Sequence, residues 1–496
     1  MSTYESDRTT SRAKEEHHRM AHHSQPHPAE VRGPVTPPRS GTRLRDRGRR
    51  ILAATATAAL LLTGATACGG TTESPESKSS PAPKEPFAPA QLAQAWKTAP
   101  AEGETLLTPL MATWRTKTAY YVGRGTGVEI LDAATGKLLG TLAPPEPDMH
   151  PCGMTEGLTA DGLGAIAWIK GDPLDVKASC DRVSLVDTRN GSSITWTKQV
   201  SGALMDGKPL TDDTTRLAFI AGGLLAVMTP NTVVGLRPDG TEAWTWRNAG
   251  VPLNQYVLNW GMSAHHDRLM VMIGVQRAGW RYWVVTLDAT GKELSPEPVP
   301  IPPESHGDLV GGGPMTVILT PPGLGKTKEP ELMTFTREGR LARVIPLTSA
   351  AGPVQLNQGR RLGRASRYDI AFNGSTAYVV AGDALSSSSA LPQIVAFDLD
   401  TGATRWTQPV DTLTVPRFLG SDEDTVYVLG GKATKDMPVY AYAAKDGART
   451  QISTVKAPDT FLSMIGVAVD YSAGTLALTE PGRYSYGTVM FRSPTP

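Results

Sequence analysis

Residues 393–406 read Gln-Ile-Val-Ala-Phe-Asp-Leu-Asp-Thr-Gly-Ala-Thr-Arg-Trp, and they follow the stretch Thr-Ala-Tyr-Val-Val at 376–380. Both stretches contain an apolar run with the length and the β-branched or aromatic content of a β-strand. Asp398 can hydrogen-bond the backbone that follows it, and Gly402 suits the positive φ that a tight turn requires. Trp406 is large enough to fill a gap between adjacent sheets. We therefore predict a strand at 376–380, then a strand, a turn and a strand within 393–406.

The same order of strands and turn recurs along the chain from Ala93 onward. Seven copies have turn glycines spaced 45 to 63 residues apart, at Gly136, Gly191, Gly240, Gly291, Gly339, Gly402 and Gly447. An eighth copy begins with 474–478 and 488–491 and then runs out of chain. Its outer strand is predicted at the other terminus, in 92–98, which carries Trp96. This period predicts an all-β, eight-bladed β-propeller of four-stranded blades, closed by that N-terminal strand, with seven blades as the alternative.

The pattern Ala-x-Asp-x-x-Thr-Gly-x-x-x-Trp at Ala396–Trp406 resembles the repeat of PQQ-like (quinoprotein-type) β-propellers. The resemblance covers about residues 92–491, and the copy at 396–406 is the one that matches in full. It implies a propeller that usually has eight blades. WD40 repeats fit less well, because no Gly-His pair opens the copies and no Trp-Asp pair ends them.

Composition supports a packed, β-rich body. The chain has 496 residues with 40% hydrophobic residues, 50 Gly and 40 Pro. This excludes wholesale disorder and favours turns and short strands over long helices. Residues 1–50 have a net charge of +5 and residues 51–67 have none, so the remainder carries −4, from 38 basic and 42 acidic residues. A mildly acidic body argues against nucleic acid as the partner.

The N-terminal region is predicted to export and anchor the protein. Arginines within 43–50 precede an uncharged run at 51–67, as in a secretory signal. The run ends Leu-Thr-Gly-Ala-Thr-Ala-Cys-Gly-Gly at 62–70, which resembles a bacterial lipobox and implies lipidation of Cys68. An uncleaved anchor helix is the alternative. Both place the body on the outer face of the cell membrane, and the composition is similar to that of actinobacterial lipoproteins.

The expected organisation has four parts. It comprises a disordered basic, His-rich leader at 1–50, a signal h-region and lipobox at 51–68, a Ser/Pro-rich tether at 69–91 and the propeller at 92–496. Once Cys68 is lipidated, Cys152 and Cys180 remain as a candidate disulfide, which an oxidising compartment permits. Closing that loop would contribute roughly 3 kcal/mol. Zinc fits less well, because the two cysteines lack nearby His or CxxC spacing.

Few residue patterns point to chemistry. The stretch Gly-Leu-Gly-Lys-Thr at 323–327 resembles the end of a P-loop but lacks its earlier glycine, so a blade loop is expected. His265-His266-Asp267 offers metal ligands, yet fits a solvated loop better. The stretch at 261–265 departs from the GxSxG nucleophile elbow at its last position. Trp280 and Trp283 are core residues by default, although their place near a loop leaves one of them as a candidate for a binding surface.

The resemblance also implies what a quinoprotein enzyme would need. Enzymes of that family hold the quinone against a tryptophan, usually beside a disulfide of adjacent cysteines, with a calcium ion on acidic and amide side chains. This sequence has no adjacent cysteine pair and no such acidic cluster. We therefore predict no catalytic residue, no cofactor and no resident metal.

The predicted function is that of a membrane-anchored, extracytoplasmic, monomeric propeller acting as a non-catalytic protein-binding or scaffold module. The family's non-enzymatic members, such as the propeller lipoprotein of outer-membrane protein assembly, hold protein partners. The partners expected are the membrane, through a lipid anchor or an N-terminal helix, and an unidentified protein. A quinone (PQQ)-dependent oxidoreductase and a sensor binding a small ligand in the propeller funnel are the alternatives.

Overall fold

The chain divides into two compact units, Met1–Ser80 and Pro81–Pro496, and the computed structural model describes residues of the second. The described ranges are 91–99, 110–171, 180–189, 192–200, 216–229, 232–248, 256–277, 279–295, 297–303, 305–310, 315–320, 329–350, 352–356, 370–382, 391–410, 416–431, 436–456, 468–472, 474–480 and 487–494. The predicted leader, signal segment, Cys68 and nearly all of the tether lie outside them. Within these ranges no helix has the length and apolar character needed to cross a membrane.

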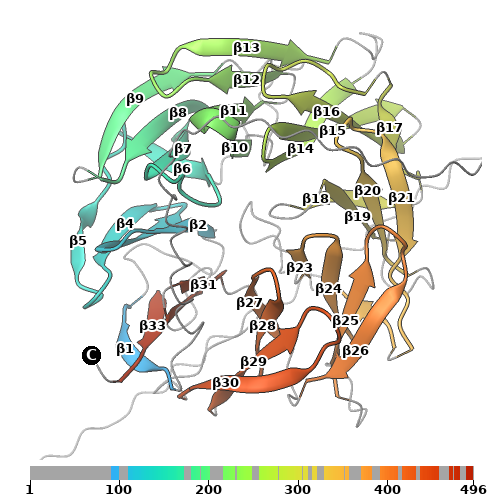
Figure 1. The fold of residues 1–496 in the computed structure, drawn as a ribbon. Helices are drawn as coiled ribbons and strands as arrows, with labels where there is room; N and C mark the ends of the chain where they lie inside the picture. The colour runs from blue at the N-terminus through green and yellow to red at the C-terminus, as the bar shows by residue number, and fades with distance from the viewer. Residues whose placement is uncertain are drawn as a thin grey trace, which may run out of the picture. The chain divides into compact units, whose positions relative to one another are not determined.

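Eight antiparallel sheets follow one another around a ring in chain order (Figure 1). This arrangement confirms the eight-bladed β-propeller and excludes the seven-bladed alternative. In the described ranges the one helix is a single 3-10 turn, η1 (Ala221–Gly223). The blades are numbered here from the N-terminus, and each begins with its innermost strand.

The first four blades run from Leu110 to Pro300. Blade 1 is β2 (Leu110–Arg115), β3 (Ala119–Arg124), β4 (Gly127–Asp132) and β5 (Leu138–Thr141). Blade 2 is β6 (Met149–Met154), β7 (Leu163–Lys170), β8 (Cys180–Asp187) and β9 (Ser193–Gln199). Blade 3 is β10 (Arg216–Ile220), β11 (Leu224–Met228), β12 (Thr232–Leu236) and β13 (Glu242–Arg247). Blade 4 is β14 (Tyr256–His265), β15 (Arg268–Arg277), β16 (Gly279–Asp288) and β17 (Val299–Pro300).

The remaining blades complete the ring. Blade 5 is β18 (His306–Val310), β19 (Thr316–Thr320), β20 (Glu331–Phe335) and β21 (Leu341–Pro346). Blade 6 is β22 (Val354–Gln355), β23 (Ile370–Asn373), β24 (Thr376–Ala381), β25 (Gln393–Asp398) and β26 (Thr404–Pro409). Blade 7 is β27 (Arg417–Ser421), β28 (Thr425–Leu429), β29 (Met437–Ala443) and β30 (Arg449–Val455). Blade 8 is β31 (Ala468–Ser472), β32 (Thr475–Thr479), β33 (Thr488–Arg492) and β1 (Ala93–Lys97).

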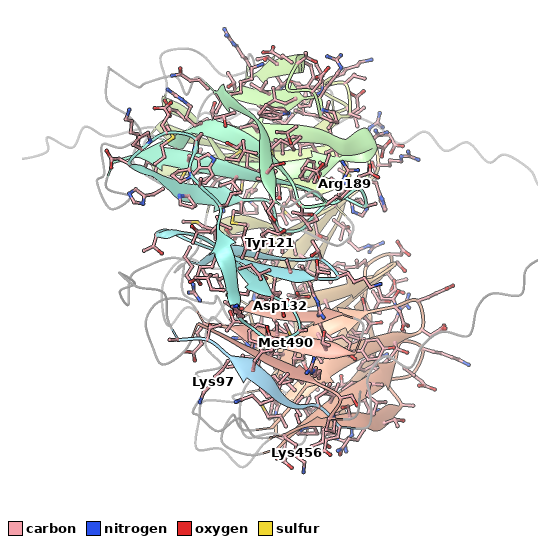
Figure 2. All side chains as sticks on the ribbon, turned by 90° about the vertical axis from the view of Figure 1, so that its left-hand side faces the viewer. Lys97, Tyr121, Asp132, Arg189, Lys456 and Met490 are labelled. Atoms are coloured by element: carbon pink, nitrogen blue, oxygen red, sulfur yellow. A yellow bond between two sulfur atoms is a disulfide. The ribbon has the colours of Figure 1, made fainter. Side chains whose placement is uncertain are left out.

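Blade 8 is built from both ends of the chain, as the sequence predicts. β1 lies antiparallel to β33, with Ala93 opposite Arg492 and Lys97 opposite Val489 (Figure 2). Beyond the strand, Thr98 accepts a hydrogen bond from Thr488 N on its Oγ1 at 2.9 Å. The guanidinium of Arg124 in blade 1 is buried and donates to the carbonyl of Glu480 in blade 8 at 2.8 Å. Pairing the terminal strands removes the sheet edge that an open array would expose.

A tryptophan on the outer strand joins several blades to the turn of the next blade. Trp406 Nε1 donates to the carbonyl of Ala444 at 3.0 Å. A Cβ added to Gly447 would come within 2.6 Å of the Trp406 ring, so only a glycine, here at φ +72°, lets the ring lie on the turn. Three more pairs repeat this contact, namely Trp96 with Ala133, Trp196 with Pro238 and Trp244 with Ala289.

The turn itself is ordered by the aspartate that begins it. Asp398 Oδ1 accepts the backbone N–H of Thr401 at 2.7 Å, and Arg405 Nε donates to Asp398 Oδ2 at 2.8 Å. These bonds lower the pKa of Asp398 to about 2, and the bond from Thr401 has the largest effect. The carboxylate is therefore charged at neutral pH and bridges the turn to the outer strand.

Other blades place a different residue at the position of this tryptophan. Register pairing puts Gly140 there in blade 1 and Arg343 in blade 5. In blade 3 the outer strand β13 contains two tryptophans, Trp244 and Trp246. The structure selects Trp244 for the turn contact, and Trp246 instead donates to Glu293 Oε1 at 2.7 Å.

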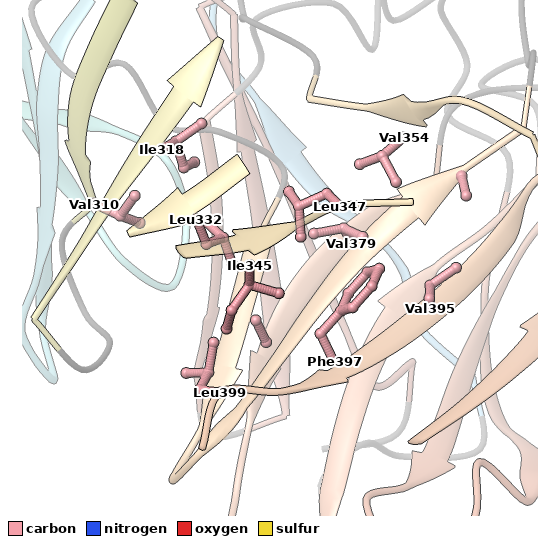
Figure 3. Close-up of a cluster of buried hydrophobic side chains, with 12 residues drawn as sticks. Val310, Ile318, Leu332, Ile345, Leu347, Val354, Val379, Val395, Phe397 and Leu399 are labelled. Carbon is pink, nitrogen blue, oxygen red and sulfur yellow. The ribbon is translucent and has the colours of Figure 1, made fainter. Parts of the chain in front are cut away.

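Apolar side chains fill the space between neighbouring sheets. One cluster joins blade 5 to blade 6, with Ile318, Leu332 and Ile345 from one sheet facing Val379 and Phe397 from the other (Figure 3). All five are almost inaccessible to solvent. Because strands alternate their side chains between two faces, each middle strand contributes to two such clusters and couples its blade to both neighbours.

Two blades depart from four regular strands. In blade 6 the innermost position is divided between β22 and β23, which both pair with β24. In blade 4 the outer strand β17 is reduced to the pairs of Trp283 with Pro300 and Val284 with Val299. The sequence predicts neither the divided innermost strand nor the short outer strand, because the repeat is recognised in the outer three strands of each copy.

Candidate functional site

The two ends of the blades differ in the length of their connections. Strands alternate in direction, so the turns after the first and third strands of a blade leave from one end, here named the turn end. The connection after the second strand and the crossing to the next blade leave from the other end, here named the loop end. At the turn end, β23 and β24 are separated by positions 374–375, and β25 and β26 by positions 399–403.

The loop end carries the long connections. β9 ends at Gln199 and β10 begins at Arg216, and β24 ends at Ala381 and β25 begins at Gln393. Connecting loops held by a rigid scaffold are where proteins concentrate their binding residues. The loop end is therefore the first place to look for a binding surface.

Blade 4 extends farther toward the loop end than its neighbours. β14, β15 and β16 each span 10 residues, whereas β10 and β11 in blade 3 and β18 and β19 in blade 5 span 5. β15 runs away from its turn at 266–267, so the additional residues lie at the loop end. We name residues 256–260, 274–277 and 279–282 the blade-4 extension.

The outer edge of the blade-4 extension has no strand beside it among the described residues. β17 pairs with Trp283 and Val284, and Ile301 N donates to the carbonyl of Tyr282 at 2.8 Å. No described strand pairs with the outer side of Gly279–Arg281. An unpaired edge offers backbone N–H and C=O groups to another chain.

The two candidate tryptophans occupy different parts of this blade. Trp283 lies opposite Ile273 and packs half-buried against the apolar cluster between blades 3 and 4, so it is a core residue. Trp280 lies within the blade-4 extension, opposite Gln276. Arg281 follows it, with an exposed side chain, opposite Val275. Arg281 is not among the residues predicted from the sequence, although the unusually long β-forming run at 279–288 could have indicated it.

Charged residues also lie on the innermost strands. Arg216 in β10, Asp308 in β18 and Arg417 in β27 belong to the strands closest to the ring centre (Figure 1). Arg417 is buried, and its charge is therefore held away from water. In blade 1, burial raises the pKa of Tyr120 to about 12, and Asp470 of β31 adds to that effect. The innermost strands thus carry charged residues of both signs.

The His265-His266-Asp267 stretch lies at the turn end. His265 is the last residue of β14, and His266 and Asp267 form the turn to β15. The two imidazole rings are 4.6 Å apart in an edge-to-face arrangement. Asp267 Oδ2 accepts Arg268 Nη1 at 2.9 Å and Arg337 Nη2 at 3.0 Å. Burial, and then the neighbouring His266, lower the pKa of His265. The carboxylate thus binds two guanidinium groups and links blade 4 to blade 5.

Two other motifs give no catalytic arrangement in the described ranges. Residues 261–265 lie within β14, and Ser263 is buried and donates through Oγ to the carbonyl of Val310 at 3.1 Å. That serine is in a continuous strand and not on a strand-to-helix turn. The P-loop-like stretch at 323–327 lies outside the described residues.

The Cα atoms of Cys152 and Cys180 lie 6.1 Å apart in the structure, a separation that a disulfide can bridge. Cys152 lies at a bulge in β6 and Cys180 begins β8, and both border the cluster between blades 2 and 3. The bond would therefore tie the innermost strand of blade 2 to its third strand across β7. Cys68 is outside the described residues.

The residues present do not fit the quinone cofactor of quinoprotein enzymes. The paired cysteines belong to different strands and are 28 positions apart, so they do not form the adjacent-cysteine disulfide of those enzymes. In the part of the chain that the structure describes, no three His, Cys, Asp or Glu side chains gather closely enough to hold a metal ion.

Comparison with known proteins agrees with the propeller type. Residues 350–483 match the model of the family described as outer membrane protein assembly factor BamB. The matched residues include the motif at Ala396–Trp406, and the match agrees with the PQQ-like repeat that this motif indicates. No curated protein matches the chain.

Similar solved structures resemble the chain at low identity. A quinohemoprotein alcohol dehydrogenase from Pseudomonas putida HK5 is 12% identical, with 81% of this chain and 76% of that chain covered and a TM-score of 0.49. BamB from Moraxella catarrhalis is 12% identical over 81% of this chain and 99% of its own, with a TM-score of 0.41. Neither likeness bears on function.

Proposed function

We propose that this protein is an exported, lipid-anchored, non-catalytic β-propeller that binds a protein partner through the blade-4 extension. The observation that carries the proposal is the unpaired outer edge of Gly279–Arg281 at the loop end. Trp and Arg are the residue types that most often dominate protein–protein interfaces, and Trp280 and Arg281 follow each other there. The matching family is named for an assembly factor, which is also a role in protein association.

A partner strand could add to this edge through main-chain hydrogen bonds. β15 supports β16 along the whole extension, from Gln276 opposite Trp280 to Gly274 opposite Tyr282. Tyr282 and Val275 are buried, so the base of the extension is anchored in the core. A rigid, preorganised edge lowers the entropy lost on binding.

The anchor is proposed from the N-terminal sequence. Substituting Cys68 with alanine should abolish incorporation of a palmitate analogue, because the thiol is the acceptor of the lipid. In-gel detection of the labelled protein from metabolically labelled cells measures this. Cys152→Ala serves as the matched control and should keep the label. Absence of label from the wild-type protein as well as from Cys68→Ala would favour the uncleaved anchor helix instead.

The disulfide is proposed as a consequence of export. An oxidising compartment favours the bond between Cys152 and Cys180, which closes the chain between β6 and β8. Alkylation of the exported protein should modify neither thiol until a reductant is added.

Partner binding is tested by crosslinking the full-length protein in its own membrane and purifying it. Arg281→Glu should lower recovery of the crosslinked partner about fivefold or more, the size of a loss at an interface anchor. Lys292→Glu is the matched control, since it makes the same charge change in the same blade at the turn end. It should leave recovery unchanged. Equal recovery with both variants would remove the blade-4 extension from the proposal.

The competing functions predict different outcomes. A quinone-dependent oxidoreductase would show dye-linked oxidation of alcohols or sugars after addition of PQQ and Ca²⁺, and robust turnover would overturn the proposal. A sensor would gain thermal stability from one small molecule, because a ligand that binds only the folded state raises its unfolding midpoint.

A further inference from the structure

The outer strand of most blades exposes polar side chains. In β9 the exposed positions are Ser193, Thr195, Thr197 and Gln199, and in β13 they include Glu242 and Arg247. Polar groups on an edge strand discourage unwanted pairing with other chains. The polar side chains therefore protect the outer edges of these blades from pairing with other chains.

Two outer strands break this rule, and both lack the tryptophan that covers the next turn. β5 exposes 51% of Leu138 and 57% of Leu139, and β21 exposes 43% of Leu341 and 41% of Val344. Blade 1 has Gly140 and blade 5 has Arg343 at the tryptophan position.

β21 is the better formed of the two edges. It spans 6 residues, against 4 in β5, and its first four, Leu341 to Val344, are all exposed. Ile345 is buried in the cluster between blades 5 and 6 and fixes one end of the strand. β21 pairs with β20 on one side and is the last strand of its sheet. Its outer edge has no paired strand among the described residues.

The charge of β21 indicates what would bind there. The stem of Arg343 lies over the next turn, with its Cδ 3.5 Å from where a Cβ of Gly402 would be. In the described ranges, the arginines of the neighbouring turns are engaged, Arg337 with Asp267 and Arg405 with Asp398, whereas no ion pair includes Arg343. Arg340 precedes the strand, and no acidic residue lies within it.

We propose that β21 is a docking strand for an extended, acidic segment of a partner protein. The segment would add to the sheet beside β21 through main-chain hydrogen bonds, as extended peptides do at other sheet edges. Apolar side chains of the segment would cover Leu341 and Val344, and its carboxylates would approach Arg343 and Arg340. This surface is separate from the blade-4 extension and does not depend on the function proposed for it.

A second copy of this chain is a poorer occupant. Pairing β21 with β21 would place Arg343 and Arg340 of both copies along the same edge. Pairing β21 with β5 would bring Lys137, which precedes Leu138, toward the same arginines. Like charges across a strand pair are destabilising. An acidic segment would bring no positive charge to this edge, so neither of these repulsions would arise.

The test uses the full chain and three short synthetic peptides, with binding followed by fluorescence anisotropy. One peptide alternates Glu with Val, the second alternates Lys with Val, and the third has the first sequence with N-methylated alternate amides. The Glu peptide should bind, with affinity that falls as salt is added. The Lys peptide and the N-methylated peptide should bind at least about tenfold more weakly, because one lacks charge complementarity and the other cannot join the sheet.

Variants then assign the surface. Arg343→Glu should weaken binding of the Glu peptide roughly fivefold, as expected for reversing one exposed charge contact. Lys137→Glu, the same charge change beside β5, is the matched control and should leave the affinity unchanged. The proposal is overturned if the Lys peptide binds equally well, if the N-methylated peptide keeps its affinity, or if both variants lose the same amount. Concentration-dependent dimerisation that Arg343→Glu alters would instead assign the edge to a second copy.

Discussion

A chain that begins at Thr98 should be much less stable than one that begins at Gln91. The two differ by residues 91–97, which comprise β1 with the largely buried Trp96 and, just before it, the fully buried Leu92. Burying two such side chains stabilises the folded state by about 3–6 kcal/mol. Loss of β1 also exposes the edge of β33, which should make the shorter chain aggregate. Urea unfolding, with light scattering as a second readout, measures both effects.

A peptide that spans residues 91–99 provides the control for this truncation. Added in excess to the shorter chain, it should raise the unfolding midpoint, because it can pair with β33 in the register of Ala93 with Arg492. The same peptide with Trp96→Ala should have a smaller effect. Equal urea midpoints for the two chains would show that the ring does not depend on its N-terminal strand.

Trp406→Ala should lower the free energy of unfolding by about 3–5 kcal/mol, the usual cost of removing a large buried aromatic side chain. The ring lies on the turn glycine Gly447 and stacks against Tyr442, with ring centroids 6.1 Å apart. Its removal would leave a cavity between blades 6 and 7 that this glycine cannot fill. Chemical denaturation of the purified protein gives the value.

Trp406→Phe separates the bulk of the ring from its hydrogen bond. Phenylalanine keeps most of the contact with the turn but cannot donate to the carbonyl of Ala444. The expected loss is therefore smaller, about 0.5–1.5 kcal/mol for one hydrogen bond. If both variants unfolded at the wild-type denaturant concentration, the tryptophans would not couple the blades.

The architecture could be predicted because its signals are local. A tight turn needs Asp398 and Gly402 within a few residues, and the outer strand places Trp406 at a fixed distance from them. Trp96 then identified the strand missing from the last blade, although its partner strand β33 lies at the other end of the chain. Each of these residues has one structural role, and that role determines which residue type can occupy the position.

The two proposed binding surfaces could not be predicted in the same way. The blade-4 extension depends on how far β15 and β16 continue together, and hydrophobic periodicity does not mark where a hairpin ends. The exposure of Leu341 and Val344 depends on whether other parts of the fold cover β21, which is a tertiary property. Apolar residues in a β-rich run are read as core, so these two were indistinguishable from buried neighbours.

Closure of the ring by the two termini has a consequence for biogenesis. Thr98, at the end of the first strand, bonds to Thr488, which is 390 positions away. β1 is therefore synthesised before the other strands, yet it has no strand to pair with until the last blade has been made. Contacts of such long sequence separation make folding slow. A chain that terminates before β33 cannot pair β1, so its ring stays open. Such a chain should be more accessible to quality-control proteases than the full-length protein.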